Sequence, residues 1–289
     1  DLLICLVFIT HSRPPSIYTL SLHDALPICL MDLGLSNKTA LVCASSRGLG
    51  KACAISLARE GCDVVINSRS LENLTLAQSE IKQITGKTVS VVQADLNTQE
   101  GRDKVLASCA QVDILVNNNE GPPPGDFSQW TQEDWNSALE ANLLAPTFLI
   151  QAVLPGMQKR KFGRIVNITS AMVKSPKGVM GLSTAARSGL TALCKGLSQD
   201  VAADNVTINN MLPERFDTDR QKQMAELAMA FKKITYEEAR EEIAQTIAAK
   251  RLGQPSEFGD ACAFLCSAQA GFISGQNLQL DGGSYMGLI

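Results

Sequence analysis

The sequence predicts a single α/β domain built on a doubly wound parallel sheet with helices on both faces. From Lys38 onward, short runs rich in β-branched residues alternate with helical stretches. The runs are apolar throughout, as strands buried on both faces of a parallel sheet are. The 289 residues contain no internal repeat or low-complexity segment and require no second domain. Strands and helices that alternate at this spacing are typical of doubly wound sheets.

Seven runs are predicted to be the strands of this sheet. In chain order they are residues 38–43, 63–67, 89–93, 113–117, 164–168, 206–210 and 277–280. A helix is predicted over residues 48–61, because Ala54, Leu57 and Ala58 share one helical face and Gly61 provides a stop signal.

Residues 219–250 interrupt this alternation and are predicted to form a long helical insertion. Thr235 and Glu238 have the spacing of a capping box, which predicts that a second helix begins within the insertion. An insertion of this kind beside a cofactor cleft is expected to act as a substrate lid.

Residues 1–30 are predicted to be an extraneous leader, so that the folded domain spans residues 31–289. Residues 18–28, YTLSLHDALPI, resemble the in-frame translation of a common sequencing adapter, and Met31 then makes a fresh start. The alternative is an export signal, for which the opening residues DLLICLVFIT would supply the apolar part. These residues lack an initiating Met and a basic leader, and they are too few to span a bilayer.

The composition is that of an ordinary soluble protein, and the cofactor domain is expected to be cytoplasmic. The net charge is −3 and no run of lysines and arginines stands apart, so neither nucleic acid nor a membrane is expected as a partner. The nine cysteines have irregular spacings and are expected to be reduced core residues. Both histidines, His11 and His23, precede Met31, so His-based metal sites and Ser-His triads are excluded from the rest of the chain. No metal site is predicted.

The turn after the first predicted strand has the features of a phosphate-binding loop. Residues 43–50, CASSRGLG, lead directly into a helix. Gly48 and Gly50 would let the backbone approach a pyrophosphate, while the start of the helix presents free N–H groups to it. An ordinary glycine turn is the alternative.

The end of the second predicted strand indicates which dinucleotide is bound. In dinucleotide-binding folds this position meets the adenosine ribose, where an acidic residue would accept hydrogen bonds from the 2′-hydroxyl. Here Ser68 and Arg69 offer hydrogen-bond donors and a positive charge, which suit a 2′-phosphate. The sequence therefore favours NADP(H), with a solvated surface arginine as the alternative.

Residues 35–286 resemble a short-chain dehydrogenase/reductase with a Rossmann-type fold, of the bacterial 3-oxoacyl-acyl-carrier-protein reductase type. CASSRGLG matches the family's glycine-rich turn, with Ala44 where the first glycine usually stands, and NNNEG at 117–121 matches its Asn-Asn-Ala-Gly stretch. RLGQPSEFG and SGQNLQLDGG match its closing signature. The cofactor contacts are predicted from the glycine-rich turn, from the end of the second strand and from the resemblance. They are Ser45, Arg47, Gly48, Leu49, Gly50, Ser68, Arg69, Asp95, Leu96, Asn117, Arg187, Pro213 and Thr218.

The resemblance implies four catalytic residues, two of which depart from the family. Asn142 matches the asparagine that anchors a proton-relay water, and Ser170 matches the serine that steadies the substrate oxygen. Ser183 stands where the family has its proton-donating tyrosine, and Arg187 stands where it has the lysine that lowers the pKa of that tyrosine. A serine hydroxyl is a far poorer acid than a phenol, and a permanently charged guanidinium can grip ribose or a carboxylate without relaying a proton.

Two further departures leave alternatives open. Glu120 and Glu214 occupy positions where the family usually has glycine, and they would either bind a cationic group or face solvent. No replacement acid is evident, because the only tyrosines after Met31 are Tyr236, in the insertion, and Tyr285, near the C-terminus.

The favoured function is an NADP(H)-dependent oxidoreductase that reduces a carbonyl (3-oxoacyl-like) or imine group of a small molecule. The alternatives are a catalytically impaired NADP(H)-binding protein, acting as a sensor or inactive subunit, and a purely structural oligomer partner. The resemblance also implies a homotetramer.

Overall fold

The computed structural model describes residues 31–288, and the compact unit within them begins at Leu33. The predicted leader, residues 1–30, lies outside the described residues. The unit contains one sheet of seven parallel strands in the order β3-β2-β1-β4-β5-β6-β7, which confirms the predicted fold class. The strands are β1 (Thr39–Val42), β2 (Asp63–Ser68), β3 (Ser90–Gln93), β4 (Ile114–Asn117), β5 (Gly163–Ile168), β6 (Val206–Pro213) and β7 (Asn277–Leu280). All seven predicted strands are therefore present.

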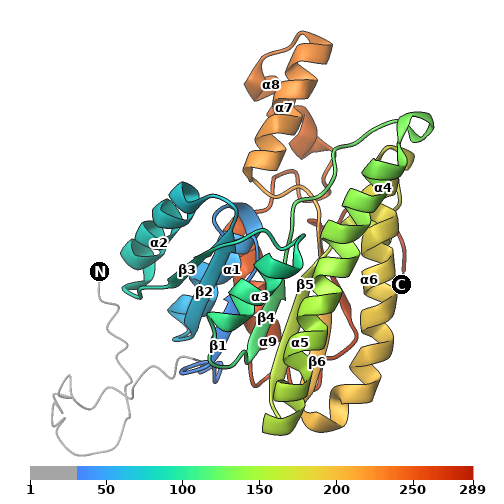
Figure 1. Cartoon of the computed structure of the whole chain (residues 1–289). Coiled ribbons are helices and arrows are strands. Elements are labelled where there is room, and N and C mark those ends of the chain that lie inside the picture. Colours follow the sequence, from blue (N-terminus) through green and yellow to red (C-terminus); the bar gives the residue numbers. More distant parts are fainter. Residues whose placement is uncertain (1–30, 289) are drawn as a thin grey trace, which may run out of the picture. The chain divides into compact units, whose positions relative to one another are not determined.

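Helices cover both faces of the sheet (Figure 1). One apolar core lies between the sheet and helices α1 (Gly48–Arg59), α2 (Leu71–Thr85) and α9 (Pro255–Cys266). The other lies between the sheet and helices α3 (Gln99–Ala107), α5 (Ala145–Arg160) and α6 (Gly181–Val201). Side chains alternate between these cores along β1, where Ala40 contributes to the first and Leu41 to the second.

Short 3₁₀ turns complete the unit. They are η1 (Phe127–Gln129), η3 (Ala171–Val173), η4 (Gly178–Met180) and η5 (Ala202–Asp204).

The helix before β5 contains an irregular turn. Helix α4 (Gln132–Leu139) runs through the π-helical turn η2 (Glu140–Leu144) into α5. Together they are long and apolar enough to cross a membrane by length and composition, but many core helices pass this test and α5 packs on the sheet. Asn142 lies within the π turn, a kind of helix irregularity that is frequent at functional sites.

The predicted insertion consists of two helices. They are α7 (Asp219–Lys232) and α8 (Tyr236–Gln245), which pack on each other and stand apart from the sheet (Figure 1). The capping box is confirmed: Thr235 Oγ1 accepts from the backbone N–H of Glu238 at 3.2 Å, and Glu238 Oε2 accepts from that of Thr235 at 2.8 Å. A two-pronged ion pair from Arg240 to Asp217, at 3.0 and 2.9 Å, ties α8 to the loop after β6.

A row of asparagine side chains crosses the carboxyl half of the sheet. The Nδ2 atom of Asn117 donates to Asn167 Oδ1 at 2.9 Å, Asn167 donates likewise to Asn210 at 2.9 Å, and Asn210 to Asn277 at 2.8 Å. Each pair is in direct register on neighbouring strands, and the first three asparagines are buried. We call this row the asparagine ladder.

The seven cysteines in the described residues are all free, and six of them are buried. Burial raises the pKa of Cys43, Cys62 and Cys194 to about 12, so these thiols are protonated at neutral pH. Six of these seven cysteines lie in the core as predicted, whereas Cys109 is only partly buried. Within residues 31–288, no group of three or more His, Cys, Asp or Glu side chains gathers as a metal site.

Candidate active site

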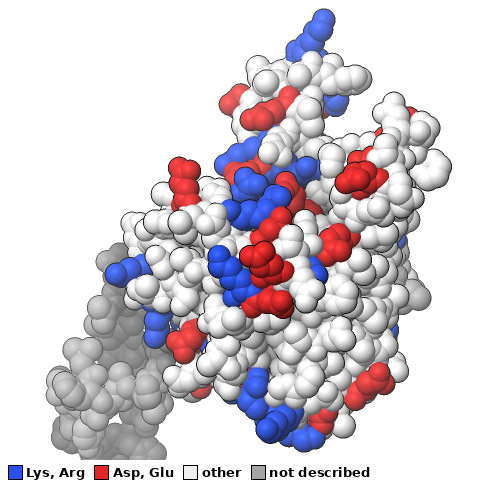
Figure 2. Space-filling view, viewed as in Figure 1, with Lys and Arg blue, Asp and Glu red and all other residues white. Residues whose placement is uncertain are grey.

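An open cleft of about 420 Å³ lies where the carboxyl ends of the strands meet the first turn of α7. This edge of a doubly wound sheet is where such folds bind ligands. Charged side chains of both signs gather on the face shown in Figure 2, below α7 and α8. The cleft brings together these predicted site residues: Arg47, Gly48, Leu49, Ser68, Arg69, Asp95, Leu96, Ser170, Ser183, Arg187, Pro213 and Thr218.

The turn between β1 and α1 is shaped to receive an anion. A Cβ atom at Gly50 would lie 2.6 Å from the carbonyl oxygen of Ala44, so this close backbone approach requires glycine. No side chain caps the start of α1 and no acidic residue lies in its first turn. The N–H groups there are therefore available to a pyrophosphate. Ala44 has a φ of +43°, which suits the glycine that the resemblance expects at this position.

Two predicted cofactor residues have side chains that do not line the cleft. Ser45 is fully buried, donates to the carbonyl of Val42 at 2.6 Å and accepts from the backbone of Asn67 at 3.1 Å. Asn117 belongs to the asparagine ladder. The neighbouring Asn118, which sequence reasoning did not single out, lines the cleft and donates to the carbonyl of Ala44 at 3.1 Å.

The expected adenosine end of the cleft is bridged by an ion pair. The guanidinium of Arg69, after β2, contacts the carboxylate of Glu120, after β4, and both side chains are largely exposed. Glu214 is elsewhere: it lies 3.6 Å from the guanidinium of Arg215 and lines a separate cavity. The two glutamates therefore do not form a common site for a cationic group.

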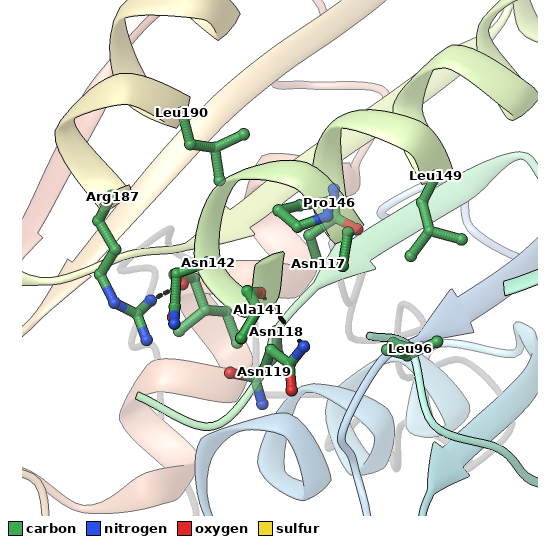
Figure 3. Close-up of a pocket in the computed structure, with 12 residues that line it drawn as sticks. Leu96, Asn117, Asn118, Asn119, Ala141, Asn142, Pro146, Leu149, Arg187 and Leu190 are labelled. Carbon is green, nitrogen blue, oxygen red and sulfur yellow. Dashed lines mark hydrogen bonds between the residues drawn. The ribbon is translucent and has the colours of Figure 1, made fainter. Parts of the chain in front are cut away.

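Asn142 is buried beside the cleft, in a small cavity shown in Figure 3. Its Nδ2 atom donates to the carbonyls of Glu120 at 3.3 Å and Ala138 at 3.4 Å. Its Oδ1 atom has no partner among the described residues, and neither does Oδ1 of Asn117 on the same cavity. The cavity volume is about 10 Å³, close to the minimum that one water molecule needs.

Ser183 and Arg187 lie one turn apart on α6 and are joined by a hydrogen bond. Arg187 Nε donates to Ser183 Oγ at 3.2 Å, and Arg187 Nη1 donates to the carbonyls of Ile168 at 2.7 Å and Thr169 at 3.1 Å. Both side chains are buried, and burial lowers the pKa of Arg187 to about 10. The guanidinium is therefore still charged at neutral pH. Figure 3 shows Arg187 reaching from α6 toward Asn142.

The remaining hydroxyl groups have distinct places. Ser170 caps the turn η3, where its Oγ accepts from the backbone of Met172 at 3.2 Å while the side chain borders the cleft. Tyr236 borders a different cavity beside α8, and the ring of Tyr285 lies 5.3 Å from the amino group of Lys174. Among the described residues, no tyrosine lines the cleft.

Comparisons with known proteins agree with this geometry. A family model described as enoyl-(acyl carrier protein) reductase matches residues 43–285. The NADPH-dependent reductase BacG of Bacillus subtilis is 33% identical over 86% of this chain and 98% of its own length. The 3-oxoacyl-[acyl-carrier-protein] reductase FabG of Escherichia coli is 32% identical over 88% of this chain and 100% of its own.

A solved structure shares the same arrangement of elements. The L-sorbose reductase of Gluconobacter frateurii, complexed with NADPH and L-sorbose, superposes with a TM-score of 0.85. It is 28% identical, and the match covers 89% of this chain and all of that one. The fold and its cleft define an α/β oxidoreductase, and the chain belongs to the short-chain dehydrogenase/reductase family.

Proposed function

We propose that this protein is a reductase that acts on the carbonyl or imine group of a small molecule, with Ser183 and Arg187 at its reaction centre. NADP(H) is its cofactor, as in the NADPH-dependent relatives. The observation that carries the proposal is the single cleft, which joins the uncapped start of α1 and Arg69 to Ser170, Ser183 and Arg187.

The residues around the cleft fit NADP(H). The first turn of α1 offers N–H groups to the pyrophosphate, and Arg69 offers its guanidinium to the 2′-phosphate. Asp95, Leu96, Pro213 and Thr218 border the same cleft and complete the proposed set. When bound, NADPH supplies the hydride that carbonyl reduction requires.

In this proposal Ser183 and Arg187 act on the substrate oxygen. Because Ser183 Oγ accepts a hydrogen bond from Arg187, its own proton is free to be donated to that oxygen. The guanidinium would stabilise negative charge as it develops there. Serine is a poor acid, so the oxygen takes its final proton from water entering the open cleft.

The absence of a tyrosine from the lining of the cleft, within residues 31–288, favours one alternative. In this alternative the protein binds NADP(H) without turnover and serves as a sensor or an inactive subunit. A general acid typically contributes on the order of 10² to 10⁴ in rate, so its loss would leave a weak reductase or none.

An NADPH titration followed by a screen of ketones, 3-oxoacyl thioesters and imines tests these two functions. The reductase proposal expects NADPH to bind and to be consumed with at least one substrate class. Binding without consumption across the panel would support the sensor or inactive subunit instead.

The assembly and location are also inferred. We infer a homotetramer that acts in the cytoplasm, as the resemblance implies. Leu144 at the end of η2, Phe148 on α5 and Leu193 on α6 are partly exposed apolar residues, which suits the pairing of these helices between subunits. Light scattering coupled to size exclusion measures the subunit number directly, and a monomer would overturn this inference.

A further inference from the structure

Arg187 has one guanidinium nitrogen, Nη2, that donates no hydrogen bond to a described residue. Its Nε and Nη1 atoms donate to Ser183, Ile168 and Thr169, whereas no described residue accepts from Nη2. The residue as a whole is only 9% exposed, and no carboxylate in the described part of the chain forms an ion pair with it. A buried cation of this kind is costly unless an anion or further acceptors compensate it.

The other large buried arginine shows what a purely structural guanidinium looks like. All three nitrogens of Arg164 donate: Nε to the carbonyl of Ser267 at 3.2 Å, Nη1 to the carbonyls of Gly163 and Asn205 at 2.9 Å, and Nη2 to Asn205 Oδ1 at 3.3 Å. Arg164 lines none of the cavities described above. Arg187 differs because its remaining donor borders the cleft.

Gly121 leaves space beside this donor. A Cβ atom at Gly121 would lie 3.3 Å from Nη2 of Arg187 and 3.9 Å from Oγ of Ser183. The amino group and the hydroxyl therefore converge on one point at the wall of the cleft. Glycine at this position keeps both of them open to a ligand.

The acidic side chains of the cleft are engaged elsewhere. Glu120 contacts Arg69, Asp95 accepts from the backbone of Asn97 at 3.0 Å, and Asp219 pairs with Lys222 at 3.2 Å. None of them neutralises Arg187. The compensating anion would therefore come from a ligand.

We propose that Nη2 of Arg187 binds the carboxylate of the substrate, and that the substrate is a small 2-oxo acid. In such an acid the carboxylate and the carbonyl group sit on adjacent carbons. With the carboxylate on Arg187, the carbonyl oxygen falls next to the Ser183 hydroxyl, which is bonded to the same guanidinium. This assignment rests on the proposed reductase function and names its substrate class. The cofactor is the other source of an acceptor for this nitrogen, through a phosphate or through the ribose that Arg187 is also expected to contact, and the experiment separates the cofactor from the substrate.

The test measures binding rather than turnover, with oxamate as the probe and ethyl oxamate as its uncharged counterpart. Oxamate has the shape and charge of a 2-oxo acid but is not reduced. With the protein saturated by NADPH, we expect oxamate to bind at least about tenfold more tightly than the ester, as loss of a hydrogen bond to a charged group predicts. Equal affinity for both probes would overturn the proposal.

Two variants test the site, one at the proposed donor and one at the glycine beside it, and each has a matched control. Arg187→Gln should lower oxamate affinity by at least about tenfold, while Arg220→Gln, on an exposed arginine of the same cleft, should leave it within about twofold. Gly121→Ala narrows the space beside Nη2 and should also weaken oxamate binding, whereas Gly178→Ala, in open space, is its control. Unchanged affinity in Arg187→Gln or in Gly121→Ala would contradict the site.

The remaining outcomes separate the competing explanations. If oxamate competes with NADPH and Arg187→Gln weakens NADPH binding as much as oxamate binding, the anion is a cofactor phosphate and the substrate assignment is wrong. If oxamate binds as expected but neither pyruvate nor methyl pyruvate is reduced, the carboxylate site stands and the reductase proposal fails. If methyl pyruvate is reduced as well as pyruvate, the assignment of the 2-oxo acid class is wrong.

Discussion

At the scale of single residues, the two buried arginines have different tasks. Arg164 joins β5 to the carbonyls of Ser267 and Asn205, so its removal leaves several buried acceptors unpaired. Burial lowers the pKa of both arginines, but Arg187 has fewer acceptors to offset its charge, and its Nη2 atom has none among the described residues. The same residue type therefore serves stability at one position and a ligand at the other.

This contrast predicts different costs of removal. Arg164→Met should lower the free energy of unfolding by about 3 kcal/mol. Arg187→Met should cost at most about half as much, because removing the uncompensated charge recovers part of its desolvation penalty. Chemical denaturation of the two variants measures both values, and equal losses would contradict the distinction.

At the scale of elements, the loops after β2 and β4 compete with the cofactor. The Glu120 carboxylate forms an ion pair with the guanidinium of Arg69, and the 2′-phosphate of NADP(H) is proposed to bind the same guanidinium. An exposed pair of this kind contributes only about 0.2–1 kcal/mol, so the cofactor can displace it.

Substitutions in this pair should change cofactor affinity in opposite directions. Glu120→Gln should tighten NADPH binding by about two- to fivefold and leave NADH binding nearly unchanged, because it frees Arg69. Arg69→Ala should remove most of the preference for NADPH over NADH. Fluorescence titration with both cofactors measures these effects. Equal affinity of the unmodified protein for NADPH and NADH would refute the role of Arg69.

The asparagine ladder links four strands beneath the cleft. Asn167→Leu keeps the volume but leaves Nδ2 of Asn117 and Oδ1 of Asn210 without their partner. We expect a loss of about 2–4 kcal/mol in the free energy of unfolding. Asn277→Ala, at the half-buried end of the ladder, should cost about 1 kcal/mol. Similar losses for both variants would show that the central position has no special role.

At the scale of the whole molecule, the compact unit begins at Leu33, so the leader should be dispensable. A chain that begins at Met31 is expected to melt at the same temperature and to bind NADPH with the same affinity as the full chain. Thermal unfolding and NADPH titration of the two chains check this prediction. A marked loss of thermal stability in the shorter chain would show that residues 1–30 belong to the fold.

The sequence predicted those features that depend on local pattern. The seven strands appear as short apolar runs, and the start of α8 is visible in the spacing of Thr235 and Glu238. Features that need strand register or the meeting of distant loops were not predicted. The asparagine ladder requires four strands in register, and the pair of Arg69 with Glu120 joins residues 51 positions apart.

At the candidate site, the surroundings of Arg187 likewise could not be predicted from local sequence pattern. Its place next to Ser183 on a helix follows from their four-residue spacing, but its burial and its unused nitrogen do not. These properties depend on the end of β5 and the residue after it each supplying a carbonyl group, from Ile168 and Thr169, and on the loop at Gly121 supplying no side chain.

The most direct test of the central claim is the reduction of a neutral ketone by NADPH in the unmodified protein and in the double variant Ser183→Tyr with Arg187→Lys. If the cleft holds cofactor and substrate as proposed, it lacks only an acid of suitable pKa for such a ketone, and the phenol beside a lysine supplies one. We predict weak reduction by the unmodified protein and a gain in kcat/KM of at least about tenfold in the double variant, with each single variant gaining less. NADPH binding by both proteins with no consumption by either would contradict the claim.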